Sequence, residues 1–321
     1  MTTIIVVGAG GQLGRALLAP LGELRDAATG KPANVIAVRR DAEDPACAVD
    51  LTDPPETASR IAALAPDVIV NAAAYTAVDA AEDAPALAYA VNAEGPATLA
   101  DVARRMGALL VHFSTDYVFD GSGTRPWREQ DQPAPLGVYG RSKYAGEQAV
   151  SASGCDHWII RTSWVYGPGT GNFLDTMLRL GAERSALQVV EDEIGAPTHV
   201  ALLSSALRQM LAQRLAHGTG PAGIYHLTAS GETSWHGFAC AIFSEARQRR
   251  IQPSIDPDDI APIASVDYLT RAERPLNSRL DTARVQSEFG LELRAWQADV
   301  AEEISRRAQI VSERTSTDGD D

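Results

Sequence analysis

The sequence has few cysteines, and their spacing favours no structural role. Cys47, Cys155 and Cys240 are far apart and odd in number, which argues against a disulfide framework or a cysteine-ligated zinc site. None of the six histidines forms an H-x-x-x-H or similar metal-binding pair, so we expect no metal. A G-x-S-x-G segment is also missing, which argues against a serine hydrolase.

Long apolar runs and an excess of basic residues are missing as well. No apolar run reaches about 18 residues, and the N-terminus passes into Ile4-Ile5-Val6-Val7 without a basic segment or cleavage site. We therefore expect a cytoplasmic protein. The formal net charge of −14 argues against binding to nucleic acid or to a membrane. An anionic ligand would have to be held by helix N-termini and particular arginines.

Short apolar runs alternate with helical patterns in the first half of the 321 residues. This alternation predicts an α/β fold with a Rossmann-like, doubly wound parallel sheet. The expected strands are residues 3–7, 34–38, 67–71, 109–114 and 157–161. The expected helices between them are residues 13–18, 54–65, 84–106 and 138–151.

Beyond Gly167 the pattern loosens, and helices are expected near residues 173–180, 201–212, 235–246 and 296–308. We interpret residues 1–166 as the dinucleotide-binding domain and residues 167–311 as a smaller C-terminal substrate-binding lobe. This boundary is soft, and the chain could recross it. The acidic tail, residues 312–321, contains no large apolar residue, so it is expected to be disordered.

A glycine-rich loop follows the first expected strand directly and opens the first helix. It reads Gly8-Ala9-Gly10-Gly11-Gln12-Leu13-Gly14. Glycines at 8, 11 and 14 allow a tight turn, a close backbone approach to a pyrophosphate, and close packing of helix on strand. The loop predicts a dinucleotide site, with contacts from Gly8, Gly11, Gln12, Leu13 and Gly14.

The second expected strand ends in Arg39 and Arg40. Two guanidinium groups suit the 2′-phosphate of NADPH, so we expect NADPH, with NADH as a possible cofactor. The alternative is that both arginines are simply solvated. Two further segments are candidates for the cofactor site: Asp50-Leu51 at the adenine edge, and Ala72-Ala73-Ala74, where small residues would permit close approach or simply pack well.

Tyr139 and Lys143 are spaced i and i+4 on an expected helix, so they share one face. A cation about 4 Å from the phenol, at an effective dielectric near 20, would favour the phenolate by roughly 4 kcal/mol. We therefore expect Lys143 to lower the pKa of Tyr139 toward the range useful for proton transfer. Thr115 and Asp116 follow another strand, where the Thr115 hydroxyl could bind a carbonyl oxygen or merely cap a turn.

These motifs resemble the dTDP-4-dehydrorhamnose reductase family, within the extended short-chain dehydrogenases/reductases. The similar segments are residues 11–14, 70–79, 113–120, 138–147, 161–166, 195–198, 225–227 and 274–280. The resemblance implies reduction of the C4 ketone of a dTDP-linked dehydro sugar. In that reaction Tyr139 would protonate the oxygen, Lys143 would tune Tyr139 and bind the nicotinamide ribose, and Thr115 would assist.

The resemblance also implies residues that bind the sugar nucleotide. Asp116 would contact the sugar, and Trp164 would form an apolar wall against its ring, although core packing would explain a tryptophan there too. Arg274 and Arg279 are candidates for the substrate diphosphate; surface ion pairs would explain them equally well.

The chain departs from the family at two places. Many members have Asp-Gln where this chain has Asp192-Glu193, which puts any contact by that amide in doubt. Some members dimerise through magnesium bound by glutamates, and the corresponding positions here are Ala16 and Ala201. Because alanine cannot bind a metal, we predict a monomer or weak homodimer without a magnesium bridge.

Two other functions remain open at this stage. A nucleotide-sugar epimerase or dehydratase could use the same scaffold, but dehydratases of this type resemble a Thr-Asp-Glu pattern, and the third position here is Tyr117. A non-catalytic nucleotide-binding subunit could keep the glycine loop. The intact set of Tyr139, Lys143 and Thr115 argues against a subunit that only binds.

Overall fold

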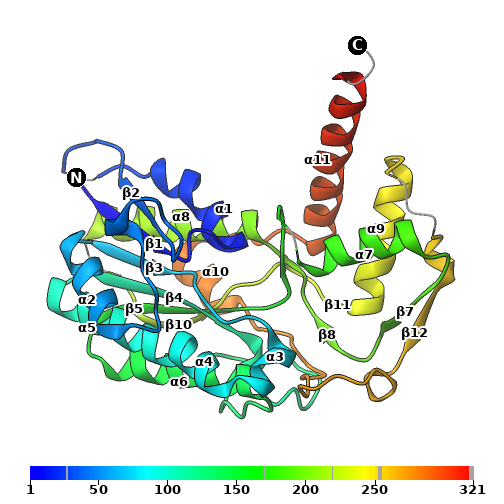
Figure 1. Cartoon of the computed structure of the whole chain (residues 1–321), viewed down its shortest axis with the longest axis horizontal. Coiled ribbons are helices and arrows are strands. Elements are labelled where there is room, and N and C mark those ends of the chain that lie inside the picture. The colour runs from blue at the N-terminus through cyan, green and yellow to red at the C-terminus, as the bar shows by residue number, and fades with distance from the viewer. Residues whose placement is uncertain (27, 170, 219, 252–254, 318–321) are drawn as a thin grey trace.

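The computed structural model describes residues 1–317 except 27, 170, 219 and 252–254, and side chains only as far as residue 310. Within this part of the chain, six parallel strands form the central sheet in the order β10-β5-β4-β3-β1-β2 (Figure 1). Their bounds are β1 Thr3–Val7, β2 Asn34–Val38, β3 Val68–Asn71, β4 Leu109–Thr115, β5 Asp156–Thr162 and β10 Gly223–His226. This order, with β1 between β2 and β3 and all strands parallel, confirms the predicted Rossmann-like, doubly wound sheet.

Helices cover both faces of the sheet (Figure 1). One layer contains α1 (Gln12–Gly22), α8 (Val200–His217) and α10 (Ala283–Phe289), and the other contains α2 (Pro54–Ala63), α5 (Gly95–Met106) and α6 (Val138–Ala152). Alternate residues of β1 point to opposite faces. Ile4 therefore packs in the core with Leu17 of α1, whereas Ile5 packs with Ile61 of α2. Burial on both faces explains why these strands are continuous apolar runs.

The helical segment expected over residues 84–106 is present, but a π-helical turn divides it into two α-helices. The segment contains α4 (Pro85–Tyr89), a π-helical turn η2 (Ala90–Glu94) and then α5, and it is preceded by α3 (Val78–Asp83). Proline lacks an N–H, so Pro96 cannot donate the α-helical hydrogen bond to the carbonyl of Asn92, and its ring would crowd that carbonyl. The wider π turn relieves this conflict.

A smaller lobe packs around its own hydrophobic core, which contains Tyr166, Leu174, Phe238 and Val300. Its helices are α7 (Phe173–Glu183), α9 (Trp235–Gln248) and α11 (Trp296–Thr317). Its paired strands are β7 (Leu187–Val190) with β12 (Ile260–Ile263), β8 (Ile194–Gly195) with β11 (Thr233–Ser234), and β6 (Val165–Tyr166) with β9 (Thr198–His199). Short 3-10 turns are η1 (Pro45–Cys47), η3 (Asp116–Val118), η4 (Pro257–Asp259) and η5 (Ser265–Asp267).

The chain recrosses the boundary that we placed after residue 166. Strand β10 pairs with β5 in the central sheet, and α8 packs against α1 on its face. Residues 167–311 therefore contribute to both parts, and their assignment to a substrate-binding lobe remains a proposal.

The disorder expected from residue 312 stays a prediction, and the described backbone of that tail is helical. The α11 backbone stays helical to Thr317, because each residue added to an existing helix gains a hydrogen bond without a new nucleation cost. The rest of that prediction, residues 318–321, lies outside the described residues.

Candidate active site

The glycine loop lies at the point where the strand order reverses, between β1 and β3. The chain runs from β1 to β2 on one side and then returns to β3 on the other, which leaves a crevice at the carboxyl ends. Gly8 has φ +82°, and a Cβ there would lie 2.6 Å from the backbone nitrogen of Ala73. A Cβ on Gly14 would lie 2.1 Å from the Gly8 carbonyl oxygen. Glycine is thus required for strand, loop and helix to pack this closely.

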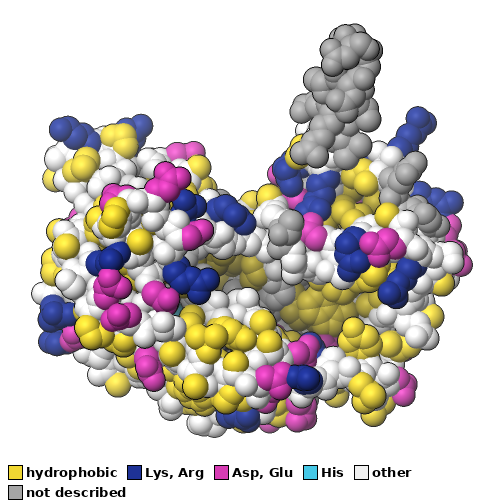
Figure 2. Space-filling view, in the orientation of Figure 1, with side chains coloured by type: hydrophobic (Ala, Val, Ile, Leu, Met, Phe, Trp, Pro, Cys, Tyr) yellow, Lys and Arg dark blue, Asp and Glu magenta, His cyan; other side chains and the backbone are white. Residues whose placement is uncertain are grey.

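A cavity of about 870 Å³ opens from this crevice toward the lobe. Figure 2 shows the surface hollowed between the two parts of the molecule, with hydrophobic side chains gathered on the lobe side. Most of the predicted site residues line it: Gly8, Gly11, Gln12, Leu13, Arg39, Arg40, Asp50, Leu51, Ala72, Ala73, Ala74, Thr115, Asp116, Tyr139, Lys143 and Trp164. Residues far apart in the sequence therefore meet in one place.

Gly14, Arg274 and Arg279 are not among the described residues that line this cavity. Gly14 acts through packing. Arg274 donates to Asp79 at 2.8 Å, and the Nε of Arg279 donates to Glu232 at 2.7 Å. Both arginines are thus held by carboxylates, as the ion-pair alternative describes, and a role at the substrate diphosphate stays a proposal.

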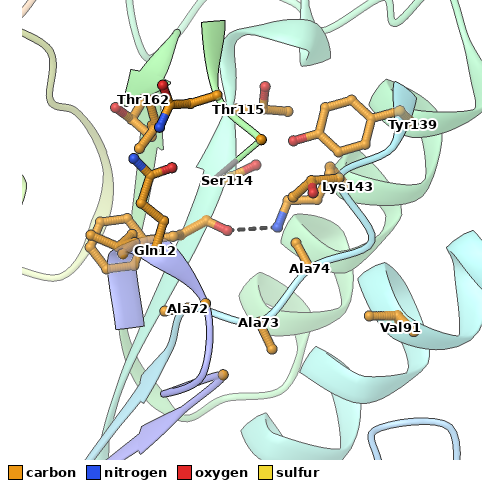
Figure 3. A pocket seen from close by; sticks show the side chains of 18 of the residues that line it. Gln12, Ala72, Ala73, Ala74, Val91, Ser114, Thr115, Tyr139, Lys143 and Thr162 are labelled. Carbon is orange, nitrogen blue, oxygen red and sulfur yellow. Dashed lines mark hydrogen bonds between the residues drawn. The ribbon is translucent and has the colours of Figure 1, made fainter. Parts of the chain in front are cut away.

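Tyr139 and Lys143 both project from the first turns of α6 toward the end of β4 (Figure 3). Lys143 is only 2% exposed, and its ammonium donates to the carbonyl oxygen of Phe113 at 2.6 Å. Burial lowers the pKa of Lys143 to about 8, while the nearby Glu147 carboxylate raises it. Lys143 therefore carries its charge in a dry site, close to where the reacting atoms would lie.

The expected lowering of the Tyr139 pKa by Lys143 is wrong for this structure. Burial raises the pKa of Tyr139 to about 12, the hydrogen bond with Thr115 lowers it, and the charge of Asp116 raises it. The ammonium of Lys143 is turned toward the Phe113 carbonyl, and loss of solvent destabilises the phenolate. Tyr139 therefore keeps its proton at neutral pH and can serve as an acid.

Thr115 and Asp116 are coupled at the carboxyl end of β4. Thr115 donates to Oδ1 of Asp116 at 3.0 Å and accepts from the backbone N–H of Tyr117 at 3.2 Å, so its turn-capping role is real. Oδ2 of Asp116 has no hydrogen-bond partner among the described residues. Burial raises the pKa of Asp116 to about 6, against the nearby Ser278 side chain and the Thr115 hydrogen bond, which lower it. An unpartnered oxygen on the cavity wall fits a polar ligand.

A buried ion pair between α6 and β5 lies next to this end of β4. Glu147 and Arg161 are 2% and 1% exposed, and the guanidinium donates to both carboxylate oxygens, at 2.9 and 2.6 Å. Ser114 donates to the same carboxylate at 2.5 Å. Sequence reasoning missed this network, although Glu147 follows Lys143 by one helical turn, which was the available signal.

Aromatic residues form the wall of the cavity on the lobe side. Trp164 stacks on Trp235, with ring centroids 3.6 Å apart and planes 9° apart, and Phe173 lies beside Trp235. All three line the cavity. Trp164 is thus at once packed and on the cavity wall, and its contact with a sugar stays a proposal. Trp235 and Phe173 were missed, because in the sequence they look like ordinary core positions.

The other end of the cavity fits a dinucleotide. Arg39 and Arg40 are exposed at its rim, so solvation alone would also suit them. Asp50 lies near Arg40, and its pKa is lowered by hydrogen bonds from Thr52. Nε2 of Gln12 and Oγ1 of Thr162 are buried without a partner among the described residues. Two unused polar groups beside a glycine cradle are what a phosphate and ribose ligand would require.

Three expected absences concern the described residues alone. In that part of the chain no cluster of His, Cys, Asp or Glu is placed to hold a metal, and no helix combines the length and hydropathy needed to cross a bilayer. Ala16 lies on α1 and Ala201 on α8, and a methyl side chain offers no oxygen that could bind magnesium. The oligomeric state and the cellular location remain predictions.

Comparison with known proteins agrees with this site. The RmlD substrate binding domain family matches residues 1–309. The chain is 42% identical to the dTDP-4-dehydrorhamnose reductase of Escherichia coli (strain K12), over 92% of this chain and 95% of that protein. It is 44% identical to that of Streptomyces griseus, over 93% and 91%. The crystal structure of the Bacillus anthracis enzyme in complex with NADP has a TM-score of 0.81 at 33% identity, covering 95% of this chain and 100% of that chain.

Three features together define the class of protein: the doubly wound sheet, the glycine loop where its strand order reverses, and the group Thr115, Tyr139 and Lys143. This class is the nicotinamide-dependent oxidoreductases of the extended short-chain dehydrogenase/reductase type. Within that class the chain belongs to the RmlD substrate binding domain family.

Proposed function

We propose that the protein reduces the C4 ketone of dTDP-4-dehydro-L-rhamnose to dTDP-L-rhamnose, with NADPH as the cofactor. The observation that carries the proposal is that Tyr139, Thr115 and Lys143 meet the glycine loop in one cavity. The names of the relatives at 42% and 44% identity support the choice of substrate, and the NADP complex of the Bacillus anthracis enzyme supports the choice of cofactor.

The cofactor would lie along the glycine loop, with its 2′-phosphate near Arg39 and Arg40 and its nicotinamide ribose near Lys143. When bound, NADPH supplies the hydride. The backbone contact between Gly8 and Ala73 leaves no room for side chains at the loop, so the helix N-terminus can face the pyrophosphate. The dinucleotide end would thus fix the position from which the ketone is reduced.

The protein would supply the proton and stabilise the developing oxygen charge. Tyr139 holds its proton at neutral pH, since its pKa of about 12 lies far above 7, and it would donate that proton to the C4 oxygen. Thr115 now donates to Asp116, so a substrate oxygen must take this hydrogen bond from the carboxylate. The ammonium of Lys143 would favour the phenolate left on Tyr139.

The test is an assay of NADPH oxidation with dTDP-4-dehydro-L-rhamnose and its UDP and GDP counterparts, with identification of the product epimer. We expect turnover to favour the dTDP sugar. Tyr139→Phe should lower kcat by about 100-fold or more, the usual contribution of a general acid. Tyr144→Phe, on the same helix but outside the described cavity lining, is the matched control. A loss of less than about tenfold in Tyr139→Phe would contradict the assigned mechanism.

A further inference from the structure

Trp164 occupies a backbone conformation that its side chain does not favour. Its φ is +48°, in the left-handed region where bulky residues are rare. Such a conformation costs about 1–3 kcal/mol and persists only where the surroundings hold it. The stacked ring of Trp235, 3.6 Å away between centroids, is one such contact. The orientation of the Trp164 ring is therefore set by its neighbours.

The segment from Glu193 to Gly195, at the start of β8, contacts both rings of this pair. Strands β8 and β11 are antiparallel, with Ser234 opposite Ile194, so the register brings Trp235 beside Glu193. Oε2 of Glu193 accepts a hydrogen bond from Nε1 of Trp235 at 2.9 Å. A Cβ on Gly195 would lie 2.7 Å from Cε2 of Trp164, so the Trp164 indole lies directly against this backbone.

Glu193 is 6% exposed and is not among the described residues that line the cavity. Burial raises the pKa of its carboxyl group, the Trp235 hydrogen bond and the Arg274 guanidinium lower it, and Asp192 raises it. The Tyr117 phenol also faces this carboxylate. Burying a carboxylate is costly unless it makes hydrogen bonds, and the indole N–H supplies one. Glu193 can thus act on the cavity only through a neighbour.

We propose that Glu193 is a positioning residue: its side chain fixes Trp235, and through the stacked pair it fixes the face that Trp164 presents to the sugar. This inference rests on the proposed function, because the sugar is the ligand assigned to that wall. Trp235 requires an acceptor and not a charge, so a glutamine at position 193 could perform the same role.

Two substitutions distinguish the role of Glu193 as a hydrogen-bond acceptor from any role of its negative charge. Glu193→Ala removes the acceptor, and we expect it to lower kcat/KM for the dTDP sugar about tenfold, since small misplacements of a binding wall are amplified in the reaction rate. Glu193→Gln keeps an acceptor oxygen, and we expect it to stay within about threefold of the original protein. The KM for NADPH should not change in either variant. Glu191→Ala, an exposed carboxylate two residues away, is the matched control.

A double-mutant cycle tests whether the effect passes through the indole N–H. Trp235→Phe keeps a ring but has no donor, so adding Glu193→Ala to it should lower kcat/KM by less than about twofold further. Full additivity of the two losses would overturn the proposal. So would a rise in the KM for NADPH that matches the loss for the sugar, because that result indicates general damage to the fold.

The circular dichroism couplet of the stacked indoles tests the same contact without substrate. We expect a weaker couplet in Glu193→Ala and an unchanged one in Glu193→Gln. An unchanged couplet in Glu193→Ala would overturn the proposed role in holding the pair. If the original protein reduces no sugar ketone, the proposed function fails, and the couplet still decides whether Glu193 holds Trp235.

Discussion

Glu147→Gln should destabilise the protein far more than an ordinary loss of one surface charge. Glu147 and Arg161 are almost completely buried, and the guanidinium makes two hydrogen bonds to the carboxylate. His226, beside Arg161, stays neutral because burial and the Arg161 charge lower its pKa to about 3. The substitution therefore leaves a buried cation without a counter-ion, which costs about 3–5 kcal/mol.

Urea unfolding measures this cost, with Glu183→Gln as the matched control. Glu183 pairs with Arg179 at 3.0 Å on the exposed face of α7, where a pair contributes about 0.3–0.5 kcal/mol. Equal losses of unfolding free energy in the two variants would refute the reasoning from burial. In Glu147→Gln the pKa of Lys143 should also be lower than in the original protein, because the Glu147 charge is what raises it. The kcat of Glu147→Gln should therefore fall at a lower pH than that of the original protein.

Three further predictions concern other parts of the cavity. Gly8→Ala should abolish NADPH binding in calorimetry, because its Cβ would overlap the backbone of Ala73; wild-type affinity would contradict this. Arg39→Ala with Arg40→Ala should raise the KM for NADPH about tenfold or more and leave that for NADH unchanged, since only NADPH carries the 2′-phosphate; equal effects on both cofactors would show that the arginines are merely solvated. Asp116→Asn should stabilise the fold above pH 6: the folded pKa of about 6 exceeds the ordinary 3.8, so wild-type stability falls as pH rises through that window, by about 3 kcal/mol at most. Thermal unfolding at pH 4 and pH 7 should show this difference only at the higher pH.

The nucleotide end of the site could be predicted from the sequence because its signals are local. The glycines from Gly8 to Gly14 follow one strand and begin one helix, and the backbone contacts that require them involve this turn and a single neighbouring loop. Tyr139 and Lys143 share a face for the same reason, since the helix alone determines their spacing. Such features depend on a few consecutive residues, so their pattern survives in the sequence.

The lobe end was harder to predict because its contacts join distant segments. Trp235 reaches the cavity through the pairing of β8 with β11, and strand β10 joins the central sheet some sixty residues after β5, beyond the lobe strands and α8. Strand β10 has four residues and β11 has two, which is too short for a pattern of alternating apolar and polar residues. Glu147 and Arg161 likewise meet only because α6 packs against β4 and β5. These contacts follow from tertiary packing, which a short sequence pattern does not record.

The i, i+4 spacing of Tyr139 and Lys143 was read correctly from the sequence, but the direction of the Tyr139 pKa shift was not. A cation near the phenol would lower its pKa, but burial acts on the same group and has no signature in an i, i+4 pattern. In the folded chain Lys143 is turned toward the Phe113 carbonyl, and burial of Tyr139 prevails. A phenol that keeps its proton suits a reductase, which needs an acid when the ketone is bound. The ammonium then contributes only as negative charge develops on Tyr139, so its effect should appear in kcat and not in the resting pKa.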